Sequence, residues 1–121
     1  MRLGEIVKML GLEILTAQEG LEKEITGGYS SDLLSDVMAH SAKGGLWITL
    51  QTHQNIVAVA SLKELGGIVL VNGRRPDAEA MVKAQQEKVP ILTTPLPAFE
   101  VVGRLYQTGL RGCSHAADVQ S

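Results

Sequence analysis

Aromatic side chains are nearly absent from this sequence, which has one Trp, two Tyr and one Phe in 121 residues. Because 45% of the residues are nevertheless hydrophobic, the core has to be built from Leu, Ile, Val, Ala and Met. The sequence also has a single cysteine, Cys113, which excludes an internal disulfide framework and favours a reducing cytoplasm. We therefore expect one compact domain with an aliphatic core.

An excess of one charge and long apolar runs are also missing. The formal net charge is -2 and no cluster of Lys and Arg occurs, so no nucleic-acid partner is expected. Near the amino terminus Glu5 and Lys8 interrupt the apolar residues, which indicates neither a signal peptide nor a membrane-spanning helix. These features predict a soluble cytoplasmic domain without a membrane partner.

What the sequence does contain is a strand–turn–helix pattern that occurs three times. Short apolar runs rich in β-branched residues at 46–50, 67–71 and 89–93 predict buried strands, and each is followed by a turn and a helical pattern. Consecutive units of this kind imply parallel strands joined by right-handed helical crossovers. The sequence therefore predicts an α/β fold with a mainly parallel sheet.

The remaining segments complete the expected domain, which spans residues 1–110 and is followed by a loose tail at 111–121. The expected elements before the first unit are a helix at 3–10, a strand at 12–15, a surface turn at 16–23, a strand at 24–29 and a helix at 33–38. The paired Gly27 and Gly28 indicate a bulge or a close backbone approach in their strand. Ser30, Ser31 or Asp32 is the expected cap of the helix at 33–38.

Apolar spacing predicts which helical faces point inward. The helix at 55–65 is apolar nearly all round, so it needs cover on a second side, and a second subunit and the amino-terminal helix are equally good candidates for that cover. Trp47 is expected in the core or in an interface. The inward residues expected on the other helices are Leu33, Leu34, Val37 and Met38; Ala78, Met81 and Val82; and Phe99, Val102, Leu105 and Tyr106.

The three loops that follow these strands should meet at one edge of the sheet, where parallel α/β folds bind ligands. The strongest signal is Asn72-Gly73-Arg74-Arg75-Pro76, since glycine, free amides at a helix start and two guanidinium groups suit a phosphate or carboxylate. The alternative is a surface turn with two solvated arginines. The candidate ligand-binding residues are Gln51, Thr52, His53, Asn55, Asn72, Gly73, Arg74, Arg75, Thr93 and Thr94.

Catalytic and metal-binding patterns are missing from the same loops. His53 lies between a strand end and a helix start without a carboxylate or serine partner, so a capping or surface histidine is preferred. Cys113 and His115 are too close together for a zinc pattern, and no second pair exists. Neither a P-loop nor a dinucleotide fingerprint is present, and no nucleophile–base set appears. We expect no enzyme, no cofactor and no metal.

Three segments of the sequence are similar to the DRTGG domain family. In chain order they are ITGGYSSDLLSDVMAHSAKGGLWITLQTHQNIVAVASLKEL, GGIVLVNGRRPD and VPILTTPLPAFEVVGRL. The resemblance implies a three-layer α/β sandwich like the amino-terminal domain of HPr kinase/phosphorylase. It also implies a regulatory or dimerising role, as in phosphotransacetylases and some CBS-containing pyrophosphatases. Stand-alone members resemble proteins found beside iron-only hydrogenase subunits. Where many members carry a Gly-Asp-Arg turn, this chain has LQTHQN at 50–55.

Two hypotheses follow. In the first, the chain is a homodimeric regulatory module that binds a small anionic ligand, with a nucleotide as one candidate, at the strand ends. In the second, it is a structural adaptor that pairs with itself or with a redox-enzyme subunit and binds no small molecule. Arg74 and Arg75 distinguish the two, because only the first hypothesis needs their charge.

Overall fold

The structure, a computed structural model, describes residues 1–113 of the chain. Its five strands form one sheet in the order β1-β5-β4-β3-β2, in which every pair is parallel except β1 with β5. The mainly parallel α/β sheet expected from the sequence is confirmed. The strands are β1 (Glu13–Ile14), β2 (Gly27–Ser30), β3 (Gly45–Thr49), β4 (Gly67–Leu70) and β5 (Ile91–Thr93).

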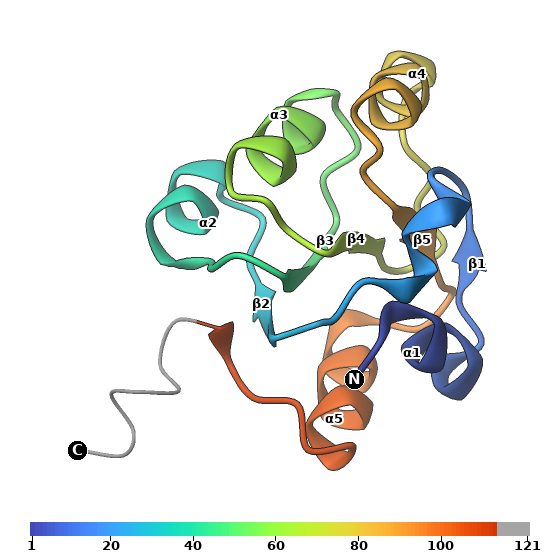
Figure 1. Cartoon of the computed structure of the whole chain (residues 1–121), viewed down its shortest axis with the longest axis vertical. Coiled ribbons are helices and arrows are strands. Elements are labelled where there is room, and N and C mark those ends of the chain that lie inside the picture. Colours follow the sequence, from blue (N-terminus) through green and yellow to red (C-terminus); the bar gives the residue numbers. More distant parts are fainter. Residues whose placement is uncertain (114–121) are drawn as a thin grey trace.

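Helices cover both faces of this sheet and so make three layers (Figure 1). One face carries α2 (Leu34–His40), α3 (Asn55–Leu62) and α4 (Ala78–Glu87), and the other carries α1 (Leu3–Leu10) and α5 (Ala98–Gln107). A 3₁₀ helix, η1 (Gln18–Glu22), packs against α1. The three-layer arrangement is therefore also as expected.

Because both faces are covered, the central strands are buried throughout. Along β3, Trp47 packs beneath α2 and α3, whereas Leu46 and Ile48 belong to the core on the opposite face. Trp47 is fully buried, and its indole Nε1 donates a hydrogen bond to the Ser31 carbonyl oxygen at 2.8 Å. Strands buried on both faces have continuous apolar sequences, which is why these strands can be predicted from the sequence.

The cover of α3 comes from within the chain. This helix lies between α2 and α4 and packs against both, with Ile56 and Val57 fully buried. The amino-terminal helix α1 lies on the other face of the sheet, so neither a second subunit nor α1 is needed to cover α3. The expectation that the amino-terminal helix covers α3 is therefore wrong, and the neighbouring helices of the same layer already bury its two sides without a second subunit.

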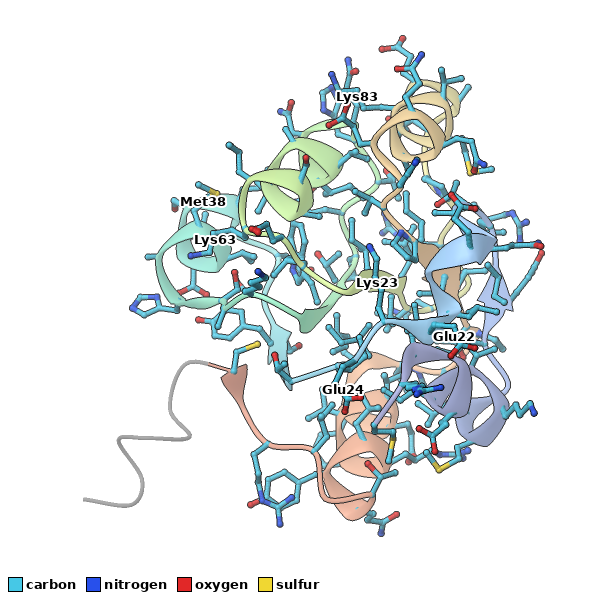
Figure 2. The ribbon with its side chains drawn as sticks, in the orientation of Figure 1. Glu22, Lys23, Glu24, Met38, Lys63 and Lys83 are labelled. Carbon is cyan, nitrogen blue, oxygen red and sulfur yellow. The ribbon has the colours of Figure 1, made fainter. Side chains whose placement is uncertain are left out.

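The expected inward face of α2 is only partly correct. Val37 is buried, but Leu33 is 64% exposed and Met38 lies on the outer side of the helix (Figure 2). The helix begins one residue later than expected, with Leu33 at its N-cap and no capping side chain on that residue. Leu34 is partly buried against the same core as Val37, so these two of the four expected inward residues are correct.

The inward face expected for α4 is wrong. The buried residues are Ala80 and Ala84, while Ala78 and Val82 are exposed. The helix begins at Ala78 and packs against α3, and the small side chains of the two buried alanines allow the helices to approach closely. Size rather than apolarity selects the contact face here.

The inward face expected for α5 is also mostly wrong. Val101 and Leu105 are buried against the sheet, whereas Phe99 is 89% and Tyr106 56% exposed, and Val102 is 39% exposed. The helix thus has two apolar stripes, and the one containing Val101 faces the core. The stripe containing Phe99 faces solvent in the single chain.

The segment at 16–23 is not a surface turn throughout. Thr16 is 3% exposed, and its hydroxyl donates to the Val89 carbonyl oxygen at 2.7 Å and accepts from the Ile91 amide at 2.9 Å. Polar composition suggested exposure, but the hydroxyl satisfies backbone groups at the start of β5. The segment therefore fastens the amino-terminal part of the chain to the edge of the sheet.

The close backbone approach expected at the paired glycines is present. A Cβ on Gly27 would lie 2.9 Å from Cα of Cys113, and the Gly28 amide donates to the Arg111 carbonyl oxygen at 2.8 Å. Gly28 and Gly112 form a parallel bridge, so residues 111–113 lie on the outer edge of β2. Residues 114–121, the rest of the expected tail with His115, lie outside the described residues.

Candidate functional site

The loops after β3, β4 and β5 meet at one edge of the sheet, which we call the rim (residues 51–55, 72–77 and 93–96). The Asp77 amide donates to the Thr52 carbonyl oxygen at 3.0 Å, and the Gly73 amide donates to that of Thr94 at 2.8 Å. These bonds join each loop to its neighbour. The fold therefore brings the ten candidate residues to a single edge.

The backbone of the rim is less available than the sequence suggests. The amides of Asn72, Gly73, Arg74 and Asp77 all donate to carbonyl oxygens of the chain. Asn72 and Gly73 have positive φ angles of 56° and 68°, which make the tight turn after β4. The expectation of free amides is thus wrong for these four residues, three of which hold a neighbouring loop, while the helix start itself lies further on, at Ala78.

The two arginines have different surroundings. The Arg75 guanidinium donates to both carboxylate oxygens of Glu13 in β1, at 3.2 and 3.1 Å. These two hydrogen bonds and the attraction between the opposite charges lower the pKa of Glu13 and raise the pKa of Arg75. Arg74 is exposed, and among residues 1–113 its guanidinium makes no hydrogen bond or ion pair. Both arginines are exposed, and within the described residues Arg74 differs from Arg75 in having no carboxylate partner.

Three other candidate side chains hold the loops in place. The Thr93 hydroxyl donates to the Arg74 carbonyl oxygen at 2.6 Å, and the Thr94 hydroxyl accepts from the Leu96 amide at 3.2 Å. His53 Nδ1 accepts from the Asn55 amide at 3.1 Å, which is the capping geometry preferred from the sequence. Both threonines are at most 4% exposed, so their hydroxyls face the loop and not the solvent.

Asp32 lies beside the rim, and sequence reasoning considered it only as a helix cap. One carboxylate oxygen accepts from the Thr49 hydroxyl at 2.8 Å and from the Leu50 amide at 2.7 Å. The Gln51 side-chain amide donates to the Asp32 carbonyl oxygen at 2.8 Å. Asp32 therefore fixes the end of β3 and the side chain of Gln51, and nothing local in the sequence signals a contact over that separation.

The side chains of four candidate residues make no hydrogen bond or ion pair within residues 1–113. They are Thr52, Asn55, Asn72 and Arg74. A guanidinium with hydroxyl and amide groups can bind an anion, but it supplies no nucleophile and base in one place. The same described residues contain no group of three His, Cys, Asp or Glu side chains that could hold a metal ion.

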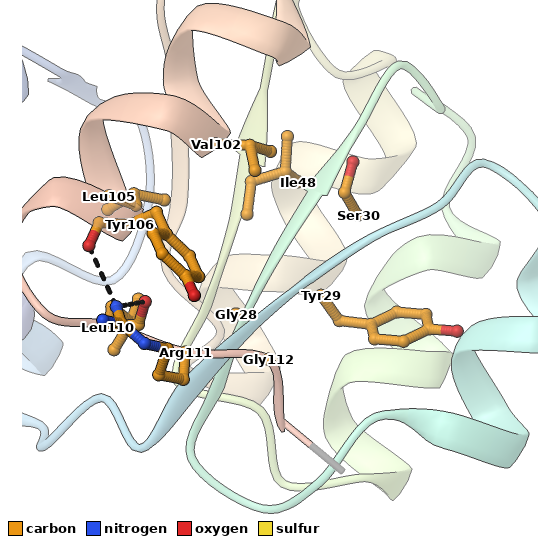
Figure 3. Close-up of a pocket in the computed structure, with 10 residues that line it drawn as sticks. All are labelled: Gly28, Tyr29, Ser30, Ile48, Val102, Leu105, Tyr106, Leu110, Arg111 and Gly112. Atoms are coloured by element: carbon orange, nitrogen blue, oxygen red, sulfur yellow. Dashed lines mark hydrogen bonds between the residues drawn. The ribbon is translucent and has the colours of Figure 1, made fainter. Parts of the chain in front are cut away.

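A second feature is an apolar hollow of about 100 Å³ between α5 and β2, which we call the α5 hollow (Figure 3). Its wall is aliphatic at Ile48, Val102, Leu105 and Leu110. The Arg111 guanidinium lies 3.8 Å from the ring centroid of Tyr106, at the mouth. The sequence could not reveal this hollow, because its wall includes residues 110–112, which were expected to lie in or beside a loose tail.

None of the helices in residues 1–113 combines the length and apolarity needed to cross a bilayer. A mainly parallel sheet between two helical layers, with polar loops gathered at the strand ends, defines an α/β domain. The DRTGG domain family matches residues 5–108, and the chain belongs to this family.

A search of curated proteins finds no match. Among solved structures, the chain is similar to the CBS and DRTGG domains of the regulatory region of Clostridium perfringens pyrophosphatase, complexed with the activator diadenosine tetraphosphate. The TM-score is 0.69 at 17% identity, and the match covers 88% of this chain. It covers 46% of that chain, so the present sequence spans less than half of its neighbour. At this identity the likeness shows the fold.

Proposed function

We propose that this chain is a non-catalytic regulatory module that acts as a homodimer in the cytoplasm and binds a small anionic ligand at the rim. Nucleotides are the first candidates for the ligand. The observation that carries the proposal is Arg74, an exposed cation on a rim whose other arginine is held by Glu13. A planar guanidinium is suited to a phosphate because it can donate two parallel hydrogen bonds.

The neighbours of Arg74 support an anion rather than a cation as ligand. Asn72 has a side chain with two N–H donors two residues away, and Thr52 supplies a hydroxyl from the adjacent loop, which is joined to Asp77. The negative charge of Glu13 is balanced by its ion pair with Arg75. An anionic ligand would therefore meet the Asn72 and Thr52 donors around the Arg74 charge, while Asp77, an exposed carboxyl of the same loop, is the rim group that opposes an anion.

The solved neighbour makes nucleotides the natural first group to test. The C. perfringens regulatory region is complexed with diadenosine tetraphosphate, a nucleotide with several phosphates. That ligand belongs to a longer chain that includes CBS domains, so it guides the choice of compounds and assigns no site here.

The test is thermal unfolding of the full chain with diadenosine tetraphosphate, ATP, AMP and uncharged adenosine. A ligand at about 100 times its dissociation constant adds about 2.7 kcal/mol to the folded state. For a domain of this length the midpoint should rise by roughly 10 °C. We expect a shift with the phosphorylated compounds and none with adenosine.

Two charge-removing variants locate the site. Arg74→Gln should abolish the shift, whereas Lys43→Gln, an equal loss of charge on the exposed loop before β3, should leave it unchanged. A shift that persists in Arg74→Gln would place the ligand elsewhere. No shift with any nucleotide or anionic metabolite, for a chain that is dimeric in solution, would instead favour the structural adaptor.

A further inference from the structure

The outer side of α5 carries an apolar stripe that nothing covers in the described chain. Phe99, Val102, Gly103 and Tyr106 are spaced i, i+3, i+4 and i+7, so they share one face of the helix. Phe99 is 89% exposed and Tyr106 56%, although the sequence has only four aromatic residues. We call these four residues the outer stripe.

Gly103 is a second unexplained feature of this stripe. A glycine inside a helix destabilises it by about 1 kcal/mol relative to alanine. A Cβ on Gly103 would meet no atom within 4 Å, so packing inside the described chain does not require glycine there. Close approach of a second helix is a use for it that the single chain does not show.

We propose that two copies of this chain associate by antiparallel packing of α5 on α5, about a two-fold axis close to Val102. This inference specifies the homodimer of the proposed function and rests on it. A two-fold contact must be self-complementary, because each residue meets the same partner in both directions. Two properties of α5 satisfy that requirement.

The first property is charge. Glu100 and Arg104 lie one turn apart on the same flank of α5, with Arg104 Nε 3.7 Å from Glu100 Oε2, and both are half exposed. In an antiparallel pair centred on Val102, Glu100 of one copy lies at the level of Arg104 of the other, and the reverse pair forms by symmetry. A formal net charge of -2 leaves little repulsion between copies.

The second property is shape. The same centre places Phe99 of one copy at the level of Leu105 of the other, and Leu105 lines the α5 hollow. The hollow measures about 100 Å³, which is less than the roughly 150 Å³ of an apolar cavity that binds benzene in a protein core. Each Phe99 would thus place part of its ring in the hollow, against the wall that includes Val102 and Tyr106 (Figure 3).

The test measures the mass of the full chain by analytical ultracentrifugation. One helix stripe is a small contact, so we expect concentration-dependent dimers, to be followed from about 1 to about 500 µM. Phe99→Glu should raise the dissociation constant at least about thirtyfold, as loss of a hot-spot aromatic does. Val82→Glu is the matched control, since Val82 is 59% exposed on α4, and it should change nothing.

Charge exchange tests the antiparallel geometry. Glu100→Arg and Arg104→Glu should each weaken the dimer roughly tenfold, because each change acts twice in a two-fold contact. The double variant with both changes should return to within about threefold of the original dissociation constant. The exchange also restores the pair within each helix, so the thermal midpoint of the monomer is measured beside the dissociation constant, and rescue of the dissociation constant beyond any change in that midpoint is the expected result.

The outcomes separate this inference from the proposed function. A dimer that persists in Phe99→Glu, or a double variant that is not rescued, overturns the α5 interface and leaves ligand binding at the rim untouched. A monomer at every concentration overturns the interface and the homodimer together, and the nucleotide-dependent unfolding shift still decides whether the rim binds an anion.

Discussion

The helices α3 and α5 differ in how their apolar residues are covered. Within Asn55–Leu62, α3 is almost wholly apolar, and α2 and α4 cover it on both sides, as its composition requires. Helix α5 carries charged residues such as Glu100 and Arg104, yet it leaves Phe99 and Tyr106 exposed. The difference lies in position, because α3 is the middle helix of its layer and α5 has α1 as its neighbour on one side (Figure 1). Surface exposure of an apolar residue thus depends on the number of neighbouring elements more than on the helix's own sequence.

The largest expected change in stability comes from a substitution on the side of α3 that faces the core. Ile56 is fully buried, so Ile56→Ala should lower the free energy of unfolding by about 3 kcal/mol and the midpoint by roughly 10–15 °C. Leu62→Ala, in the same helix but 73% exposed, should cost less than about 0.5 kcal/mol. Phe99→Ala should lower the free energy of unfolding of the monomer by a similarly small amount. Denaturant unfolding measures all three, and equal losses in Ile56→Ala and Phe99→Ala would remove the distinction between the helices.

A smaller effect of opposite sign is expected at Gly103. Gly103→Ala should stabilise the monomer by up to about 1 kcal/mol, because alanine has the higher helix propensity and its Cβ has open space. Ala58→Gly, at an exposed position of α3, should lose a similar amount by the same mechanism. If α5 pairs with itself, Gly103→Ala should also weaken the dimer while Ala58→Gly leaves it unchanged. Ultracentrifugation and thermal unfolding of the same samples report both quantities.

The smallest effect is a pH dependence in α2, which covers one side of α3. Hydrogen bonds from Ser31, Tyr29 and His40 lower the pKa of Asp36 in the folded chain. A carboxyl with a lowered folded pKa stabilises the fold above its ordinary pKa of about 4, and that stabilisation is lost as the pH falls through the folded value. Asp36→Asn should therefore lower the unfolding midpoint at neutral pH and converge with the unmodified chain in acid. The variant Phe99→Ala should follow the unmodified pH profile; a constant offset for Asp36→Asn would contradict the assignment.

Much of the fold can be predicted from the sequence, and the reasons for the misses are physical. The three central strands are predictable because burial on both faces gives continuous apolar runs such as residues 67–71. The contact face of α5 is not, because the helix has two apolar stripes and periodicity cannot tell which one meets the sheet. The buried Thr16 is missed for a similar reason, since its hydroxyl bonds to residues far along the chain.

The position of the candidate site can be predicted from the topology of the sheet. Which of its side chains are free to contact a ligand cannot. Parallel strands bring their carboxyl ends together, which predicts that Thr52, Asn72 and Thr94 share one edge. Whether a side chain at that edge is available depends on contacts such as that of Arg75 with Glu13, which joins opposite parts of the sequence. Only the folded arrangement shows that Arg74 differs from its neighbour.

The bridge between Gly28 and Gly112 has a consequence for synthesis on the ribosome. Gly28 is made early and Gly112 near the end of the described chain, so β2 pairs on its outer side only after almost everything else has emerged. A nascent chain that has folded up to α5 would still present the outer edge of β2, and open strand edges invite pairing with other chains. Emergence of residues 110–113 from the ribosome is thus the step that closes this edge.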